Sequence, residues 1–220
     1  MGYTRQSAAI GFVMLGLVAL QKNCLYKFIA WILIASLFHK SAGILIPLAI
    51  FSGRRGWGAV IGVAVIGVLL FVLILSEHLE NLITGYIIQE YNSSGATIRI
   101  AMNALPAVVY LILKNRFNIS KEQKLFWVWI SIGALIFIPV LILSPSSTAV
   151  DRVALYWIPI QIFVWSRLPF ALGKESGTRT EWSIVVIAYS FTILVVWVLF
   201  AEHSYAWVPY KFYPLVWLWK

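Results

Sequence analysis

A few ionisable side chains of this chain flank long apolar segments, and their types suit the chemistry of a diphosphate. Charge at membrane depth is costly, so such groups tend to face an interior cavity and to be functional. A guanidinium group binds phosphate oxygens through two hydrogen bonds and keeps its charge when partly desolvated. Arginines can also stabilise charge on a leaving diphosphate, and a nearby carboxylate or imidazole can take the proton of an attacking hydroxyl. The candidates are Arg5, His39, Lys40, Arg99, Asp151 and Arg152.

Helical spacing pairs two of the arginines with further polar residues. Arg99 and Asn103 are four residues apart, as are Arg152 and Tyr156, so each pair would share one face of a helix. Pro106 lies about one turn beyond Asn103. These spacings predict that each arginine has a polar neighbour on the same helix face.

Three candidates also have ordinary structural explanations. Asp151 could cap the start of a helix by accepting backbone N–H bonds. Arg5 could anchor a helix start at the membrane interface, and His39 could be a turn residue at a helix break. The sequence alone leaves these alternatives open.

The sequence shows no motif for a metal ion or a nucleotide. It contains one aspartate, one cysteine and three histidines, without a carboxylate cluster or a His/Cys spacing that suits a divalent ion. It has no Walker loop and no dinucleotide glycine motif. We therefore expect no cofactor and no bound metal.

The composition is typical of a membrane protein. Hydrophobic residues make up 61% of the chain and charged residues only 11%, whereas a soluble domain is about a quarter charged. So few polar side chains cannot cover a water-facing surface, and lipid must be the solvent for much of it. The net charge of +9 lies mostly in short loops between apolar runs, which favours membrane topology and anionic lipid over nucleic acid as its explanation.

The apolar runs predict an all-α, polytopic transmembrane helix bundle with about seven or eight membrane segments, some of them short or broken. A bilayer core requires about 20 apolar residues of helix. Pro159 interrupts one run and is expected to bend it. The runs are residues 6–21, 57–76, 97–113, 125–143, 153–168 and 182–201, with a further apolar region over residues 25–51.

The apolar region 25–51 is interrupted by His39 and Lys40. It is either one long tilted helix or two shorter helices, about residues 24–38 and 41–53, that meet at a turn. Cytoplasmic loops carry an excess of Lys and Arg, and the broken arrangement places more of these residues on the cytoplasmic side. We therefore favour two helices, which also brings all six candidates to the outer ends of their helices.

We expect residues 1–220 to form a single membrane domain with two distinct peripheral segments. An outer loop covers residues 77–95, and its carboxylates, amides and aromatic rings suit either a sugar-binding surface or an ordinary amphipathic loop. An aromatic tail over residues 202–220 is expected to lie in the membrane interface.

Four short polar motifs separate the apolar runs. They are residues 2–6 (GYTRQ), residues 37–42 (LFHKSA), residues 98–100 (IRI) with Asn103 and Pro106, and Asp151-Arg152 with Tyr156, Pro159 and Gln161. In order and spacing they resemble the EpsG-like branch of the Wzy-type O-antigen and exopolysaccharide repeat-unit polymerases, over nearly the whole chain.

The resemblance implies a multi-pass, metal-independent glycosyltransferase of the GT-C kind in the bacterial inner (cytoplasmic) membrane. Such an enzyme moves a growing glycan from its undecaprenyl diphosphate carrier onto another carrier-linked repeat at the outer leaflet, for O-antigen, capsule or exopolysaccharide. The expected partners are the undecaprenyl-diphosphate-linked oligosaccharide, membrane lipid, a chain-length regulator and a flippase. The family usually has more helices before the GYTRQ motif, so we expect this chain to be the C-terminal part of a larger polymerase-type fold, with a shortened relative as the alternative.

The resemblance also suggests roles for the candidates. His39 or Asp151 would orient or deprotonate the acceptor hydroxyl. The alternative function is a non-catalytic membrane protein that binds or transports a lipid-linked or anionic solute, which the same arginines would serve. We predict catalytic roles for His39, Asp151 and Arg152, and substrate binding by Arg5, Gln6, Lys40, Arg99, Asn103 and Tyr156.

Overall fold

The computed structural model describes residues 2–22, 24–51 and 95–201, together with the single residues 58, 61, 62, 65, 69, 93 and 204. Every regular element within these residues is a helix, so the predicted all-α class is confirmed. The predicted segment 57–76, the outer loop 77–95 and the tail 202–220 lie almost entirely outside the described residues.

The chain divides between Ser166 and Arg167 into two compact units. Helix α8 (Pro159–Leu172) contains the point of division, and α9 (Ser176–Phe200) belongs to the second unit. The single membrane domain over residues 1–220 stays a prediction. The first unit contains α1 (Gly2–Gln21), α2 (Leu25–Phe38), the 3₁₀ helix η1 (Lys40–Phe51), α5 (Ala96–Leu113), the 3₁₀ turn η4 (Lys114–Arg116), α6 (Lys121–Leu143), α7 (Ser147–Ala154) and the 3₁₀ turn η5 (Leu155–Trp157).

Three helices among the described residues are long and apolar enough to cross a membrane. They extend over Ala96–Arg116, Lys121–Leu143 and Ser176–Phe200, which confirms the helices predicted at 97–113, 125–143 and 182–201. Large apolar side chains along α9 are exposed, as expected where lipid is the solvent. The chain therefore forms a membrane helix bundle, while the predicted total of seven or eight segments stays a prediction.

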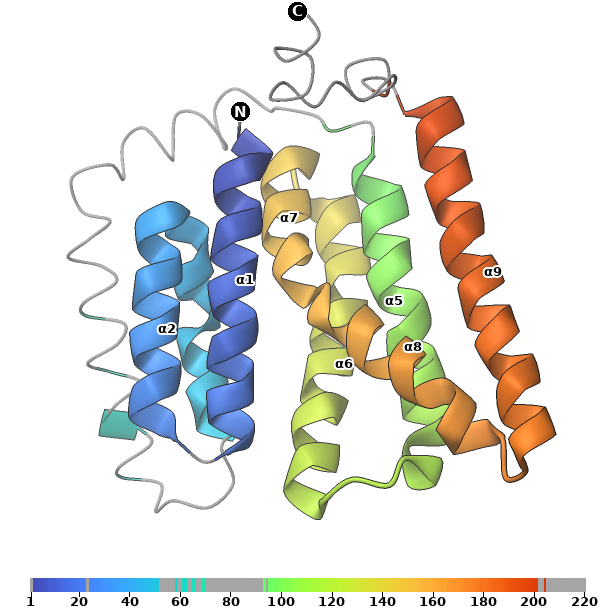
Figure 1. Ribbon diagram of the computed structural model, residues 1–220. Helices are drawn as coiled ribbons and strands as arrows, with labels where there is room; N and C mark the ends of the chain where they lie inside the picture. Colours follow the sequence, from blue (N-terminus) through green and yellow to red (C-terminus); the bar gives the residue numbers. More distant parts are fainter. Residues whose placement is uncertain are drawn as a thin grey trace, which may run out of the picture. The chain divides into compact units, whose positions relative to one another are not determined.

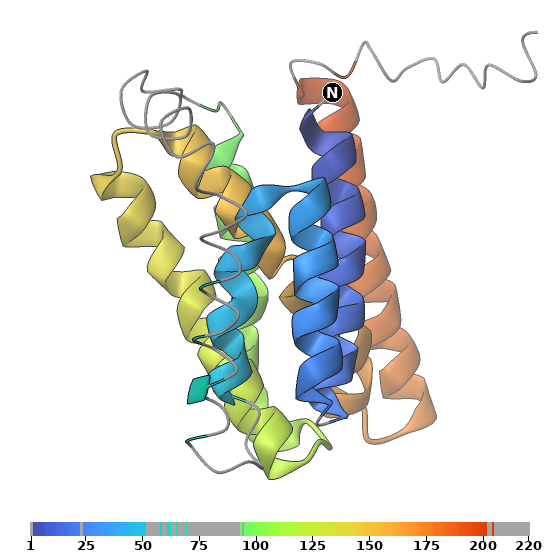
Figure 2. The ribbon, with the colours of Figure 1, turned by 90° about the vertical axis from the view of Figure 1, so that its left-hand side faces the viewer.

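The apolar region after α1 is broken at His39, as predicted. The backbone of His39 is extended, and its N–H donates to the carbonyl of Ala35 to close the last turn of α2. The 3₁₀ helix η1 begins at the next residue, Lys40. Figures 1 and 2 show α1, α2 and η1 side by side, so the break folds the apolar region back on itself.

A second break separates α7 from α8 and is also close to the predicted place. The two segments meet at an angle of 42°, next to Pro159, which has no N–H to donate. The segment begins at Ser147 rather than at residue 153, because the Ser146 hydroxyl accepts a hydrogen bond from the N–H of Ala149 and caps the helix.

Trp157 in the turn η5 packs closely on Gly133 of α6. Its indole N–H donates to the carbonyl of Ile130 at 3.0 Å, and its ring meets Phe137 edge to face at 4.8 Å between centroids. A Cβ atom added at Gly133 would lie only 2.9 Å from Trp157 Nε1. Glycine is therefore needed here for the turn η5 to sit against α6.

Gly133→Ala should destabilise the fold, because the added methyl group displaces Trp157 from α6. We expect a loss of about 1–3 kcal/mol, the usual cost of overpacking, seen as a lower apparent Tm in detergent. Gly11→Ala is the matched control, since no atom lies within 4 Å of a Cβ added at Gly11. An unchanged Tm for Gly133→Ala would contradict the close packing described.

Candidate functional site

The helix ends that carry the candidate residues gather at one end of the first unit. Figures 1 and 2 show the N-terminal ends of α1, η1, α5 and α7 at this end. Ile100 of α5 and Val150 and Ala154 of α7 form a small buried cluster between these helices. The packing of α5 against α7 therefore sets which polar side chains can meet.

Arg99 and Asp151 form a two-pronged ion pair between α5 and α7. Arg99 Nε donates to Asp151 Oδ1 and Arg99 Nη2 donates to Asp151 Oδ2, both at 2.6 Å. The Asp151 side chain is 1% exposed, whereas the Arg99 side chain is 33% exposed. Both carboxylate oxygens of Asp151 thus hold Arg99, whose side chain stays partly exposed.

Ser93 completes this ion pair from the segment before α5. Its hydroxyl accepts a hydrogen bond from Arg99 Nη2 at 2.7 Å and donates to Asp151 Oδ2 at 3.3 Å. Its backbone N–H donates to the Ser147 hydroxyl at 2.8 Å. We did not predict a role for Ser93, because a serine in a polar segment is an unremarkable loop residue in sequence.

The capping explanation for Asp151 is wrong. Asp151 lies inside α7, and Ser146 supplies the cap. The shared face of Arg99 and Asn103 is confirmed, since both side chains bond to groups of α7. Arg152 and Tyr156, the other pair four residues apart, do not lie on one continuous α-helix. Helix α7 ends at Ala154, and Tyr156 lies in the turn η5.

His39, Ser41 and Tyr156 form a second polar cluster. His39 Nδ1 lies 2.7 Å from the Ser41 hydroxyl and 3.2 Å from the Tyr156 hydroxyl. The Ser41 hydroxyl donates to the Tyr156 hydroxyl at 3.2 Å. The cluster joins the start of η1 to η5, which are far apart in sequence. Its member Ser41 was missed, although its position two residues after His39 could have drawn attention to it.

The environment of His39 favours a neutral imidazole. Burial lowers the pKa of His39 from its ordinary value of 6.5, and the positive charge of Arg152 lowers this pKa further. A base that is neutral at pH 7 is able to accept a proton. Arg152 is therefore close enough to His39 to act on it electrostatically.

Buried amides hold the backbone where α7 gives way to η5. Gln6 Nε2 donates to the carbonyl of Arg152 at 2.6 Å, and Asn103 Nδ2 donates to the carbonyl of Ala154 at 2.7 Å. Gln161 Nε2 donates to Asn103 Oδ1 at 2.7 Å. Gln6 and Asn103 are each only 2% exposed. These contacts indicate a positioning role for both, and their predicted contact with substrate stays a prediction.

The remaining two candidates are cations at the same end of the unit. Arg5 is exposed in the first turn of α1, and Lys40 is half-buried at the first position of η1. Neither forms an ion pair with another described residue. Within the part of the chain that the structure describes, no group of three or more His, Cys, Asp or Glu side chains is placed to hold a metal ion.

Neutralising one partner of the ion pair should destabilise the protein. Asp151→Asn leaves Arg99 facing an amide, and we expect a loss of roughly 1–3 kcal/mol, moderated because Arg99 is partly exposed. Arg99→Gln should have a similar effect, and the double variant should lose less than the sum of the two. Arg116→Gln, a substitution of an exposed arginine just after α5, is the control. Additive losses in thermal unfolding would show that the pair is not coupled.

Acidification should weaken the fold through His39. Because its folded pKa lies below 6.5, the unfolded chain takes up a proton first as the pH falls below 6.5, and stability decreases. Above that pH the contribution is fully present. We expect the fall in apparent Tm between pH 7.5 and pH 5.5 to be smaller in His39→Gln than in the wild type. Equal falls in both proteins would refute the lowered pKa.

A comparison with known protein families gives a match. The sequence model of the EpsG family matches residues 1–212. No curated protein and no solved structure matches the chain. Since the match extends over nearly all of its 220 residues, the chain belongs to the EpsG family.

Proposed function

We propose that this protein polymerises lipid-linked oligosaccharide repeat units for a bacterial surface polysaccharide. The observation that carries the proposal is the EpsG family match over residues 1–212, which points to an exopolysaccharide-related polymerase. The repeats would be linked to undecaprenyl diphosphate, and glycosyl transfer would occur at the outer leaflet of the inner membrane. The enzyme would be a glycosyltransferase of the GT-C kind that needs no metal ion.

The excess of positive charge at one end of the first unit supports a diphosphate substrate. Among the described residues, this end carries the four cations Arg5, Lys40, Arg99 and Arg152, and Asp151 forms an ion pair with Arg99. Guanidinium groups bind phosphate oxygens and stabilise the charge that develops as the diphosphate leaves. The exposed part of Arg99, held in orientation by Asp151, would contribute one such contact.

His39 is the better of the two predicted bases. Both oxygens of Asp151 accept hydrogen bonds from Arg99, and the side chain is 1% exposed, so Asp151 would act by positioning Arg99. His39 has a lowered pKa and is half-buried. It would take the proton of the acceptor hydroxyl, while Arg152 beside it would contact the leaving diphosphate.

The second candidate function is binding or transport of a lipid-linked or anionic solute without chemistry. The same cluster of cations favours it, since a diphosphate headgroup would be recognised in the same way. The product separates the two functions, because a polymerase lengthens the glycan whereas a transporter only relocates it.

The test is a reconstituted reaction with purified lipid-linked repeats. Wild-type protein in liposomes should yield glycans of several repeats, resolved by gel or mass spectrometry. His39→Gln should lower the rate by about 10²–10⁴-fold, the usual contribution of a general base. Arg152→Ala should lower the rate by about 10²–10³-fold, as for loss of one charge-stabilising donor, and Arg152→Lys should lose less.

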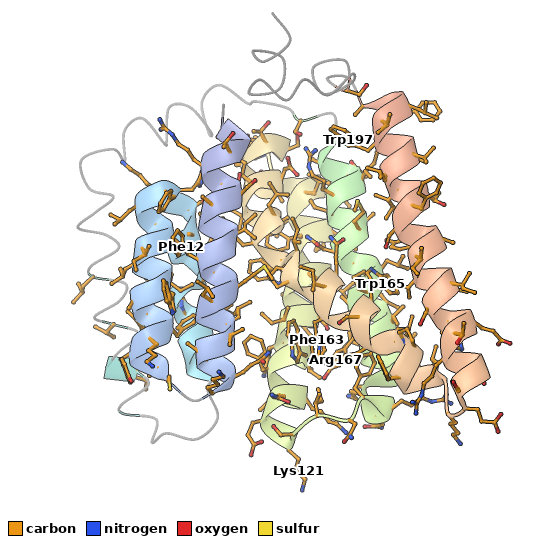
Figure 3. All side chains as sticks on the ribbon, viewed as in Figure 1. Phe12, Lys121, Phe163, Trp165, Arg167 and Trp197 are labelled. Carbon is orange, nitrogen blue, oxygen red and sulfur yellow. The ribbon has the colours of Figure 1, made fainter. Side chains whose placement is uncertain are left out.

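Lys121→Ala is the control for the arginine variant. Lys121 is an exposed cation at the start of α6, and Figure 3 shows it at the end of α6 opposite to α7. Its loss should leave the rate unchanged. If the protein moves the lipid-linked repeat across the membrane but does not lengthen the glycan, the polymerase function is wrong and the transport function is correct.

A further inference from the structure

The imidazole of His39 uses one nitrogen for all of its hydrogen bonds with the described residues. Nδ1 faces the hydroxyls of Ser41 and Tyr156, at 2.7 Å and 3.2 Å. Because Nδ1 and Nε2 lie on opposite sides of the ring, this contact turns Nε2 away from Ser41. The two nitrogens of His39 therefore have different surroundings, which is the condition for a fixed tautomer.

Which nitrogen of His39 is protonated depends on how the cluster shares its hydroxyl protons. A hydroxyl group has one proton to donate, and Ser41 donates its proton to the Tyr156 hydroxyl. With its proton on the Tyr156 side, the Ser41 oxygen is an acceptor toward His39, and the short 2.7 Å contact then fits a hydrogen bond from Nδ1–H. In a neutral imidazole that carries its proton on Nδ1, Nε2 keeps the free electron pair.

Both hydroxyls lie on segments whose backbone is held without help from the imidazole of His39. Ser41 lies in the first turn of η1, where the N–H of Ala42 donates to the carbonyl of His39. Tyr156 lies in η5, next to Trp157, which packs on Gly133. The orientation of the ring is thus set by two segments of fixed backbone, as needed for a preorganised base.

We propose that Ser41 is a positioning residue that holds His39 as the Nδ1–H tautomer, so that Nε2 is the atom that receives the acceptor proton. This inference rests on the proposed function. The acceptor oxygen forms a bond to C1 of the donor sugar, and the bond between C1 and the diphosphate oxygen breaks. The leaving lipid diphosphate keeps that electron pair, the hydroxyl proton goes to Nε2, and the imidazolium then releases one proton to water.

Nitrogen-15 spectroscopy of the imidazole tests the tautomer without any assay of activity. The chain has three histidines, so histidine-labelled protein in nanodiscs gives few signals, and His39→Gln identifies those of His39. At pH 7.5 the ring is neutral, and protonated and unprotonated ring nitrogens differ widely in chemical shift. We expect Nδ1 to be protonated and Nε2 unprotonated in the wild type. A proton on Nε2 in the wild type would overturn the inference.

Variants of Ser41 test its role in both the spectrum and the reaction. Ser41→Ala should shift His39 toward the Nε2–H tautomer and lower kcat by at least about tenfold, with little change in KM. Ser41→Thr, which keeps the hydroxyl, should restore both. Ser36→Ala is the control, because the Ser36 hydroxyl only bonds the carbonyl of Ile32 in its own helix, and it should change neither.

The outcomes separate this inference from the proposed function. If Ser41→Ala leaves the tautomer and kcat unchanged, Ser41 does not position His39, even if the wild type makes polymer. If the wild type makes no polymer while the spectra behave as expected, the proposed function fails and the control of the tautomer by Ser41 stands.

Discussion

The carbonyl groups where α7 changes into η5 take hydrogen-bond donors from two other helices, and the packing of the first unit depends on this constraint. In lipid an unpaired backbone carbonyl costs several kcal/mol. The carbonyls of Arg152 and Ala154 accept hydrogen bonds from Gln6 and Asn103. Because Gln6 lies in α1 and Asn103 lies in α5, these bonds tie three helices together at a single bend.

The same bend brings the candidate residues to their places. Asp151 and Arg152 lie on α7 before it, and Tyr156 lies in the turn after it. The change of direction lets Asp151 pair with Arg99 on α5 while Tyr156 reaches His39.

Burial of the Arg99–Asp151 pair is better understood as orientation than as stabilisation. Removing two charges from water costs several kcal/mol per ion, and the attraction between them barely repays this cost. Two hydrogen bonds to one carboxylate, however, fix the plane of the guanidinium group of Arg99.

Local features of the sequence were sufficient to predict much of the architecture. The lengths of the apolar runs predict α5, α6 and α9, the polar pair at His39 predicts the break before η1, and Pro159 predicts the bend before α8. Each of these depends on a run length, on a polar interruption of a run or on a missing N–H, and all three can be read from neighbouring residues. The start of α7 at Ser147 could also have been predicted from the sequence, because the capping residue Ser146 lies directly before it.

The partners of the polar side chains were not predictable in this way. Nothing near Asp151 indicates that it pairs with Arg99, 52 residues away, and nothing near Asn103 or Gln6 identifies the carbonyls that they bind. Partner choice depends on the rotation and depth of each helix against its neighbours. Those are set by contacts such as Trp157 on Gly133, where a single missing Cβ lets two elements approach, and such contacts exist only once the chain has packed.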